Sequence, residues 1–175
     1  MHANIDSQFR RRCDLRGAVR HAVSVDLNAY RFVSRWHVTA DRDAVFTALA
    51  DLPSYPKWWP QVRAVEPVDE ENASVVARSL LPYALRFKLT RHTEDRDRGV
   101  LQVRIDGDLD GWARLTLHAG SASCMLLYEQ QVTVQHPLLR AAAPVARPAM
   151  RWNHWLMMRS GERGLGAYVA SLGLA

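Results

Sequence analysis

Between Ala44 and Pro60 the chain reads AVFTALADLPSYPKWWP, a short helical pattern that runs into a loop rich in aromatic and proline residues. Three large rings, Tyr55, Trp58 and Trp59, fall within five residues of this loop. Left in water they would form a large apolar patch, so they either plug a core or line the rim of a cavity. The loop therefore favours a hollow fold, in which we expect one tryptophan to face inward and the other to cover the outside.

The composition predicts one globular domain. The 175 residues are 48% hydrophobic and 23% charged, with a net charge of +5, which suits a chain that buries a substantial core. The basic residues are nearly all arginine, and acidic residues are interspersed among them, so we expect no nucleic-acid partner. An alternative is that the arginine-rich segment around Arg10–Arg12 binds phosphates.

The two cysteines, Cys13 and Cys124, are far apart and neither lies in a C-x-x-C pair, so neither a zinc site nor a disulfide framework is indicated. No run reaches the roughly 18 apolar residues of a membrane span, and no signal-peptide core is present. We expect a cytoplasmic protein without stable membrane insertion. Residues 1–30 are predicted to be an N-terminal extension that is ordered in part at best, and residues 31–175 a single domain.

Alternation of apolar and polar residues predicts about seven strands. They cover residues 31–38, 63–68, 73–80, 85–93, 100–106, 112–118 and 122–134. Turn-forming segments separate consecutive strands, so neighbouring strands are expected to pair antiparallel. After the first strand, Asp41 can cap a short helix that must end before Pro53, and one further helical turn is expected around Lys57.

After Val134 the pattern becomes helical, with breaks expected at Pro137, Pro144 and Pro148 and a long helix over residues 147–172. At 100° per residue one stripe of this helix should face the sheet, and its members are Met150, His154, Met157, Gly161, Leu165, Tyr168 and Leu172, flanked by Asn153 and Met158. Trp152 and Trp155 fall on the opposite side. An outward tryptophan pair needs a partner, either the N-terminal extension or a second copy in a homodimer.

The order of strand, short helices, strand meander and long helix is typical of an α+β fold in which a curved sheet wraps around a helix. Within this order stand Trp36-His37-Val38, Val45-Phe46, Leu49-Ala50-Asp51, the Tyr55–Pro60 loop, Gly107–Gly111 and Asn153-His154. By these motifs the chain resembles, over about residues 31–172, the START-like helix-grip superfamily, also called SRPBCC, and within it the polyketide cyclase/dehydratase and lipid-transport group.

The resemblance implies a deep cavity between the concave face of the sheet and the C-terminal helix, with the aromatic loop at its lip. The implied ligand is a hydrophobic or aromatic small molecule, such as a lipid, a quinone or a polyketide. The candidate ligand-binding residues are Trp36, Phe46, Tyr55, Trp58, Trp59, Phe87, Tyr128, Met150, Asn153, His154, Met157 and Gly161. Gly161 either leaves room for the ligand or allows close packing.

No glycine-rich phosphate loop, H-E-x-x-H helix or nucleophile elbow occurs in the sequence, so we expect neither a cofactor nor a metal. The spacing of Asp106, Asp108 and Asp110 lacks the other positions of a calcium loop and fits a turn better. His154 on the inner stripe, or Tyr128 in the last strand, could act as acid or base on a carbonyl ligand. A purely structural role for each remains the other interpretation.

Two functional hypotheses follow. The first is a carrier or sensor that binds its ligand without chemistry, and the alternative is an enzyme of the polyketide cyclase/dehydratase type that uses His154 or Tyr128. Convergence of two or more of His154, Asn153, Tyr128 and an arginine on one point would favour the enzyme. An entirely apolar lining would favour the carrier.

Overall fold

The computed structural model describes residues 26–80, 83–121 and 123–173, so most of the predicted extension over residues 1–30, with Cys13, lies outside the described residues. One antiparallel sheet has the strand order β1-β7-β6-β5-β4-β3-β2. Its strands are β1 (Ala29–Val38), β2 (Val62–Pro67), β3 (Asn72–Arg78), β4 (Ala84–Asp95), β5 (Val100–Gly107), β6 (Leu109–Ala119) and β7 (Cys124–Val134). The helical elements are α1 (Arg42–Ala50), the short turn η1 (Leu52–Ser54), α2 (Tyr55–Trp58) and α3 (Pro137–Ser171). The predicted α+β architecture, with seven strands, short helices after the first strand and a long C-terminal helix, is confirmed.

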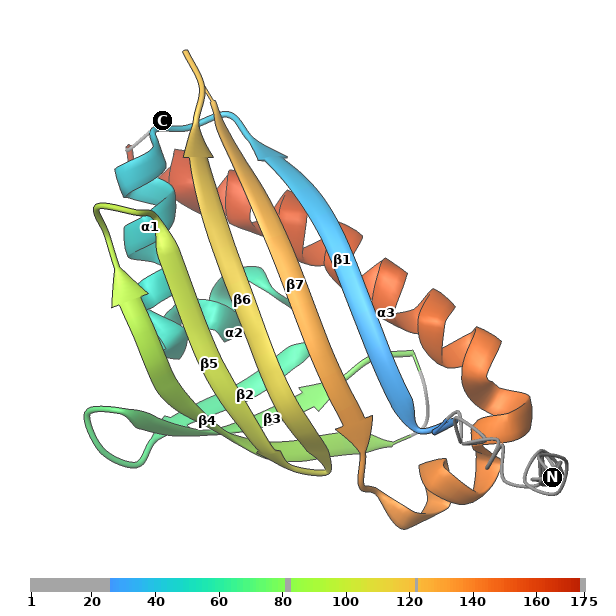
Figure 1. Ribbon diagram of the computed structural model, residues 1–175. Coiled ribbons are helices and arrows are strands. Elements are labelled where there is room, and N and C mark those ends of the chain that lie inside the picture. Colours follow the sequence, from blue (N-terminus) through green and yellow to red (C-terminus); the bar gives the residue numbers. More distant parts are fainter. Residues whose placement is uncertain (1–25, 81–82, 122, 174–175) are drawn as a thin grey trace, which may run out of the picture.

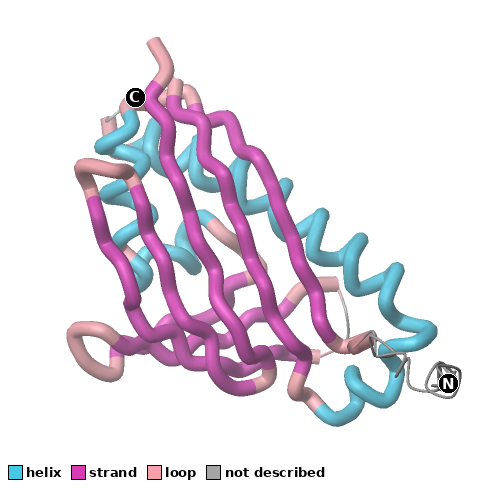
Figure 2. Tube along the Cα trace, in the orientation of Figure 1, coloured by secondary structure: helices cyan, strands magenta, loops and turns pink. Residues whose placement is uncertain are grey.

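The sheet is strongly curved, and β4 is where it bends. The pairing of β4 with β5 shifts register between Arg91 and Thr93, which is the signature of a bulge that bends its strand. Figure 1 shows β4 turning there, so that β2 and β3 cross the lower ends of the other strands. All helices lie on the side toward which the sheet bends (Figure 2). This curvature leaves a concave face opposite α3.

The short helix α1 begins and ends where the sequence predicts. The Asp41 side chain accepts the N–H of Asp43 at 2.8 Å, which stabilises the first turn. At the other end the Asp51 N–H donates to the carbonyl of Thr47. The hydroxyl of Tyr55 then donates to the Leu49 carbonyl at 2.8 Å, which fixes the aromatic loop against the end of α1.

Both tryptophans of the aromatic loop are buried, so the expectation that one covers the outside is wrong. Their rings stack with centroids 5.5 Å apart. The backbone of Trp58 lies against Gly164 of α3, and Trp59 donates its Nε1–H to the Met157 carbonyl at 3.0 Å. Because α2 passes directly beneath α3, the helix shields both rings from water.

The long helix starts ten residues earlier than predicted. α3 is continuous from Pro137 to Ser171, and the expected breaks at Pro144 and Pro148 do not end it. Pro137 stands in the first turn, where no N–H has an intrahelical acceptor. An interior proline removes one backbone hydrogen bond and bends the helix without obliging it to stop. Figure 1 shows the first turns of α3 running in a different direction from the remainder.

Several strand ends also differ from the prediction. β6 begins at Leu109, so only Asp108 of the expected Gly107–Gly111 turn lies between strands. A Cβ atom at Gly111 would collide with the backbone of β7 at Gln131, which means that this glycine allows close strand pairing rather than a turn. β7 begins at Cys124, two residues later than expected, and Ala122 lies outside the described residues.

The aspartates near this turn have structural partners. The Asp108 carboxylate accepts the N–H of Arg86 at 2.8 Å, and Asp110 pairs with Arg104 at 2.9 Å. These contacts fasten the turn to the neighbouring strand β4 and to β5. Asp106 and Asp110 lie within β5 and β6, so of the three aspartates only Asp108 occupies the turn.

The inner stripe of α3 packs against the sheet, and the outer tryptophans do not. Leu165 is fully buried, as is Val169 beside the stripe, whereas Leu172 lies past the helix end and is exposed, contrary to the prediction. Trp152 and Trp155 are exposed, as expected for the opposite side. In the described part of the chain, no helix is long and apolar enough to cross a membrane.

Alanine substitutions at two glycines of α3 should change the free energy of unfolding in opposite directions. At Gly164 a Cβ atom would collide with the carbonyl oxygen of Trp58, whereas at Gly166 nothing lies within 4 Å. We expect Gly164→Ala to lower the free energy of unfolding by about 2 kcal/mol through overpacking. Gly166→Ala should raise it by about 0.5–1 kcal/mol through helix propensity. Urea denaturation measures both values, and shifts of the same sign would contradict the described contact between α2 and α3.

Candidate ligand cavity

The concave face of the sheet, the aromatic loop and α3 enclose a cavity of about 220 Å³. Nine of the predicted ligand-binding residues line it: Trp36, Tyr55, Trp59, Phe87, Tyr128, Met150, Asn153, His154 and Met157. The middle of α3 contributes the last four. Further apolar walls come from alternate residues of every strand, which place one face of each strand toward the hollow. The cavity therefore lies between the concave face of the sheet and α3, as the family resemblance implies.

Three predicted residues, Phe46, Trp58 and Gly161, lie outside the lining. Phe46 is fully buried on α1, with the guanidinium of Arg96 4.6 Å from its ring centre. A Cβ atom at Gly161 would approach the ring of Trp59 to 2.8 Å and that of Trp36 to 2.9 Å. Of the two roles considered for Gly161, close packing is therefore the one that the structure supports.

Two residues of β1 that were not predicted, Tyr30 and Phe32, also line the cavity. Phe32 shares the face of Trp36 in the predicted strand, and extending the same alternation by one step reaches Tyr30. The Tyr30 hydroxyl donates to Sδ of Met150 at 3.3 Å. On the next turn of α3, Asn153 accepts a hydrogen bond of 2.7 Å from Ser79. These two hydrogen bonds join α3 to β1 on one side of the cavity and to the residue that follows β3 on the other.

The polar centre of the cavity is Gln130 on β7. Its amide oxygen accepts one hydrogen bond from the Tyr128 hydroxyl at 3.1 Å and another from Nε2 of His154 at 3.0 Å. Because an amide oxygen only accepts, the assigned arrangement places the histidine proton on Nε2 and leaves the Nδ1 lone pair free. The ring of Phe32 stacks on His154 with centroids 3.6 Å apart, which fixes the imidazole plane.

Burial keeps this cluster neutral. Desolvation, assisted by the nearby charge of Arg151, lowers the pKa of His154 from 6.5 to about 4, and desolvation raises the pKa of Tyr128 above its usual value. Both groups are therefore uncharged at neutral pH. Among the described lining residues the one carboxylate is Glu94, which pairs with Arg91 at 2.8 Å, and both side chains are partly exposed to solvent.

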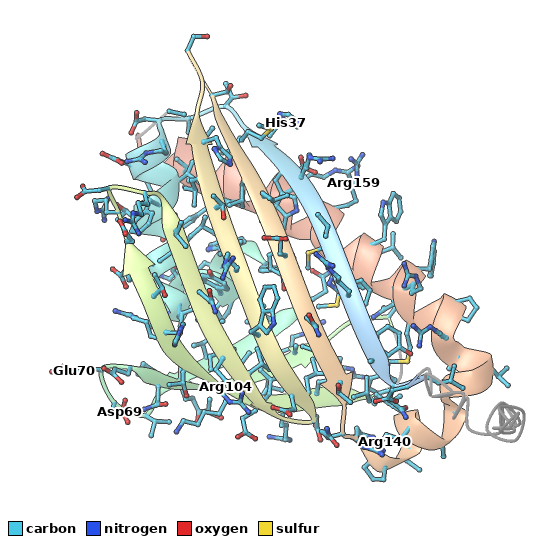
Figure 3. All side chains as sticks on the ribbon, in the orientation of Figure 1. His37, Asp69, Glu70, Arg104, Arg140 and Arg159 are labelled. Carbon is cyan, nitrogen blue, oxygen red and sulfur yellow. The ribbon has the colours of Figure 1, made fainter. Side chains whose placement is uncertain are left out.

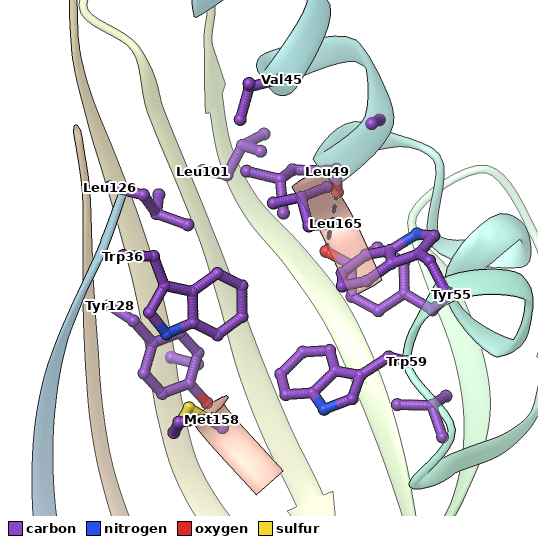
Figure 4. Close-up of a cluster of buried hydrophobic side chains, with 14 of the residues drawn as sticks. Trp36, Val45, Leu49, Tyr55, Trp59, Leu101, Leu126, Tyr128, Met158 and Leu165 are labelled. Carbon is purple, nitrogen blue, oxygen red and sulfur yellow. Dashed lines mark hydrogen bonds between the residues drawn. The ribbon is translucent and has the colours of Figure 1, made fainter. Parts of the chain in front are cut away.

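One buried donor in the cavity wall lacks an acceptor. Nε1 of Trp36 makes no hydrogen bond to the described residues, although the side chain is only 1% exposed. Figure 4 shows the Trp36 ring above Tyr128 and across from Trp59. Trp36 and Tyr128 are parallel, with centroids 6.2 Å apart. An unpaired buried donor is uncommon, because it forfeits its hydrogen bonds to water.

The profile of a family described as polyketide cyclase / dehydrase and lipid transport matches residues 29–169. The chain belongs to this family. No match is found among curated protein sequences. The predicted resemblance to the START-like superfamily is confirmed, and family and fold together fit a ligand-binding domain of the START and polyketide cyclase type.

Solved structures share the fold at low sequence identity. A protein of Thermus thermophilus is 13% identical and has a TM-score of 0.72, with 82% of this chain and 99% of that one covered. A START superfamily protein from Mycobacterium smegmatis is 14% identical, with a TM-score of 0.66 and coverage of 81% and 98%. The Zhui aromatase/cyclase from a Streptomyces species is 13% identical, with a TM-score of 0.67 and coverage of 81% and 94%. At such identities the likeness establishes the fold alone.

The lowered pKa of His154 predicts that the folded protein loses stability at acidic pH. Between pH 4 and 6.5 the unfolded chain binds a proton at this site that the folded chain does not, since the pKa falls from 6.5 to about 4 on folding. Stability should therefore rise with pH across this window, by on the order of 3 kcal/mol from this group. Urea denaturation at several pH values measures the effect, and His154→Gln should remove that part of the pH dependence.

As a control, NMR titration measures the pKa of the His154 imidazole directly. The wild type and the His154→Gln variant share all other histidines, so the difference between the stability curves of these two proteins isolates His154. A His154 resonance that titrates near 6.5, or equal pH dependence in the two proteins, would contradict the buried neutral imidazole.

Proposed function

We propose that the protein binds a neutral hydrophobic or aromatic small molecule in the cavity, as a carrier or sensor. The observation that carries this proposal is the lining, which is apolar except for a few polar groups that are mostly paired with one another. Such a cavity gains free energy by removing apolar ligand surface from water. The description of the family, which includes lipid transport, agrees with this role.

The size of the cavity narrows the ligand class. Its 220 Å³ exceed the volume of about 150 Å³ at which a dry engineered cavity holds benzene. A ligand with one or two rings, or a short acyl chain, fits this space. We expect longer molecules to extend past the partly exposed Arg91 and Glu94.

The ligand should be uncharged but carry a polar group. The one arginine or lysine of the described lining, Arg91, is paired with Glu94, and Arg151 beside His154 lies outside the lining. An anion at the Gln130 cluster would therefore lack a direct partner, and burying an unpaired charge costs several kcal/mol. Nδ1 of His154 can accept a hydrogen bond from a ligand hydroxyl. Nε1 of Trp36, which has no acceptor among the described residues, can donate to a carbonyl or ether oxygen of a ligand that displaces the side chains burying it. A phenol, a quinone or an alcohol meets these requirements.

The enzymatic alternative has one observation in its favour. His154 and Tyr128 do converge on one point, the arrangement expected for a cyclase/dehydratase. That point is, however, occupied by the oxygen of Gln130, and both available protons are used there. An imidazole with a pKa of about 4 is a weak base at neutral pH. A substrate carbonyl would have to displace Gln130 before either group could act on it.

Filling the cavity should abolish ligand binding without unfolding the protein. Ala113 of β6 lines the cavity and pairs with Gln130, so Ala113→Leu places extra atoms beside the polar cluster. We expect native mass spectrometry to detect a ligand retained by the wild-type protein and lost from this variant, with at least tenfold weaker rebinding. The matched control is Ala119→Leu, at the exposed end of the same strand. Equal ligand retention by all three proteins would contradict the cavity as the binding site.

The same purified ligand distinguishes carrier from enzyme. His154→Gln and Tyr128→Phe should change affinity by less than Ala113→Leu and leave the ligand chemically unaltered. If the wild-type protein converts the ligand, and His154→Gln stops the conversion while affinity is retained, the enzymatic alternative replaces the carrier.

A further inference from the structure

The outer face of α3 presents large apolar side chains to water. Leu138, Val145, Trp152 and Trp155 are 74%, 87%, 58% and 55% exposed. At 100° per residue Val145, Trp152 and Trp155 share one side of the helix with Arg159, whereas Leu138 belongs to the first turns, which run in a different direction (Figure 1). We call Val145, Trp152, Trp155 and Arg159 the α3 outer face. It lies opposite Met150, His154 and Met157, which line the cavity.

Basic side chains of α3 and β1 surround this face. Of the five arginines of α3, Arg159 and Arg163 fall on the side of the outer face at 100° per residue, and the one acidic residue of the helix is Glu162. The Glu162 carboxylate is already engaged, because it accepts the N–H of His37 at 3.0 Å and lies 3.9 Å from Arg159. The neighbouring edge strand β1 adds exposed Arg31 and Arg35 and no acidic residue. Figure 3 shows His37 and Arg159 projecting from the same border of the molecule.

We propose that the α3 outer face docks on an anionic lipid surface. An amphipathic helix with tryptophan and aliphatic residues among arginines is the pattern that lies in the plane of a membrane interface. Trp152 and Trp155 would sit at the headgroup level, where amphipathic rings are favoured. The guanidinium of Arg159, 5.9 Å from the Trp155 ring centre, would face the lipid phosphates.

The charge of the surface argues against a second copy of the chain as the occupant. A two-fold dimer places the same patch on both sides of the interface. Arginines of one copy would then face arginines of the other, with each Glu162 already engaged within its own chain. Like charges facing each other disfavour association, whereas phosphate groups supply the missing negative charge.

Vesicle flotation tests the proposal with the full chain. We expect binding to phosphatidylcholine vesicles that contain phosphatidylglycerol, little binding to phosphatidylcholine alone, and a loss at high salt. Trp152→Ser with Trp155→Ser should weaken partitioning by at least about tenfold, and Arg159→Gln by about fivefold. The matched control replaces two exposed apolar residues elsewhere, Val68→Ser with Met125→Ser, and should bind as the wild type does.

Three outcomes would overturn the proposal. One is equal vesicle binding by the wild type and the double tryptophan variant, which would place the contact elsewhere in the chain. Another is binding that ignores phosphatidylglycerol. The third is a dimer in native mass spectrometry that the tryptophan substitutions dissociate, without vesicle binding. The docking surface is independent of the cavity ligand, so Ala113→Leu should leave vesicle binding unchanged.

Discussion

The contact of α3 with the aromatic loop and β1 determines where the molecule is solid and where it is hollow. Gly161 admits the rings of Trp36 and Trp59, and Gly164 admits the backbone of Trp58. The hydrogen bond from Trp59 to the Met157 carbonyl joins the same elements. Because side chains larger than hydrogen would push the helix away here, the two glycines set the distance between α3 and the sheet. Every cavity dimension depends on that distance.

Electrostatics then determines what the hollow can accept. The cavity contains a histidine and a tyrosine, residues that often act as acid and base, yet burial holds both in their neutral forms. Their protons point to Gln130, so the cluster is satisfied without a ligand. A preformed neutral cluster can orient a polar group while costing little reorganisation. Ligand binding can use this neutral cluster as it stands, whereas acid–base catalysis would require His154 or Tyr128 to leave Gln130 and transfer a proton.

The sequence was a good guide where the signal was local. The alternation of β1, the Asp41 cap and the inner stripe of α3 each depend on residues near one another in the chain, and the structure has them, except that Leu172 of the stripe lies past the helix end. The errors arose where a distant segment decides the outcome. Trp58 and Trp59 are both buried only because α3 covers α2, and Gly111 lies within a strand because β7 approaches it closely. Among the cavity residues, Tyr128 and Gln130 lie two residues apart on β7, so the alternation of that strand places both on one face. The hydrogen bond from His154 joins α3 to β7, and no periodicity could predict it.

The two parts of α3 have different surroundings. Leu165 and Val169, toward its C-terminus, lie in the packed core, whereas Met150 and His154 line the cavity with one side. Substitutions at the lining positions remove fewer packing contacts than substitutions at Leu165 or Val169, so they should be tolerated better. The fold can therefore acquire a new ligand preference one residue at a time without losing its ability to fold. Evolutionary drift at the lining, with constancy at the glycines, is the pattern that this division favours.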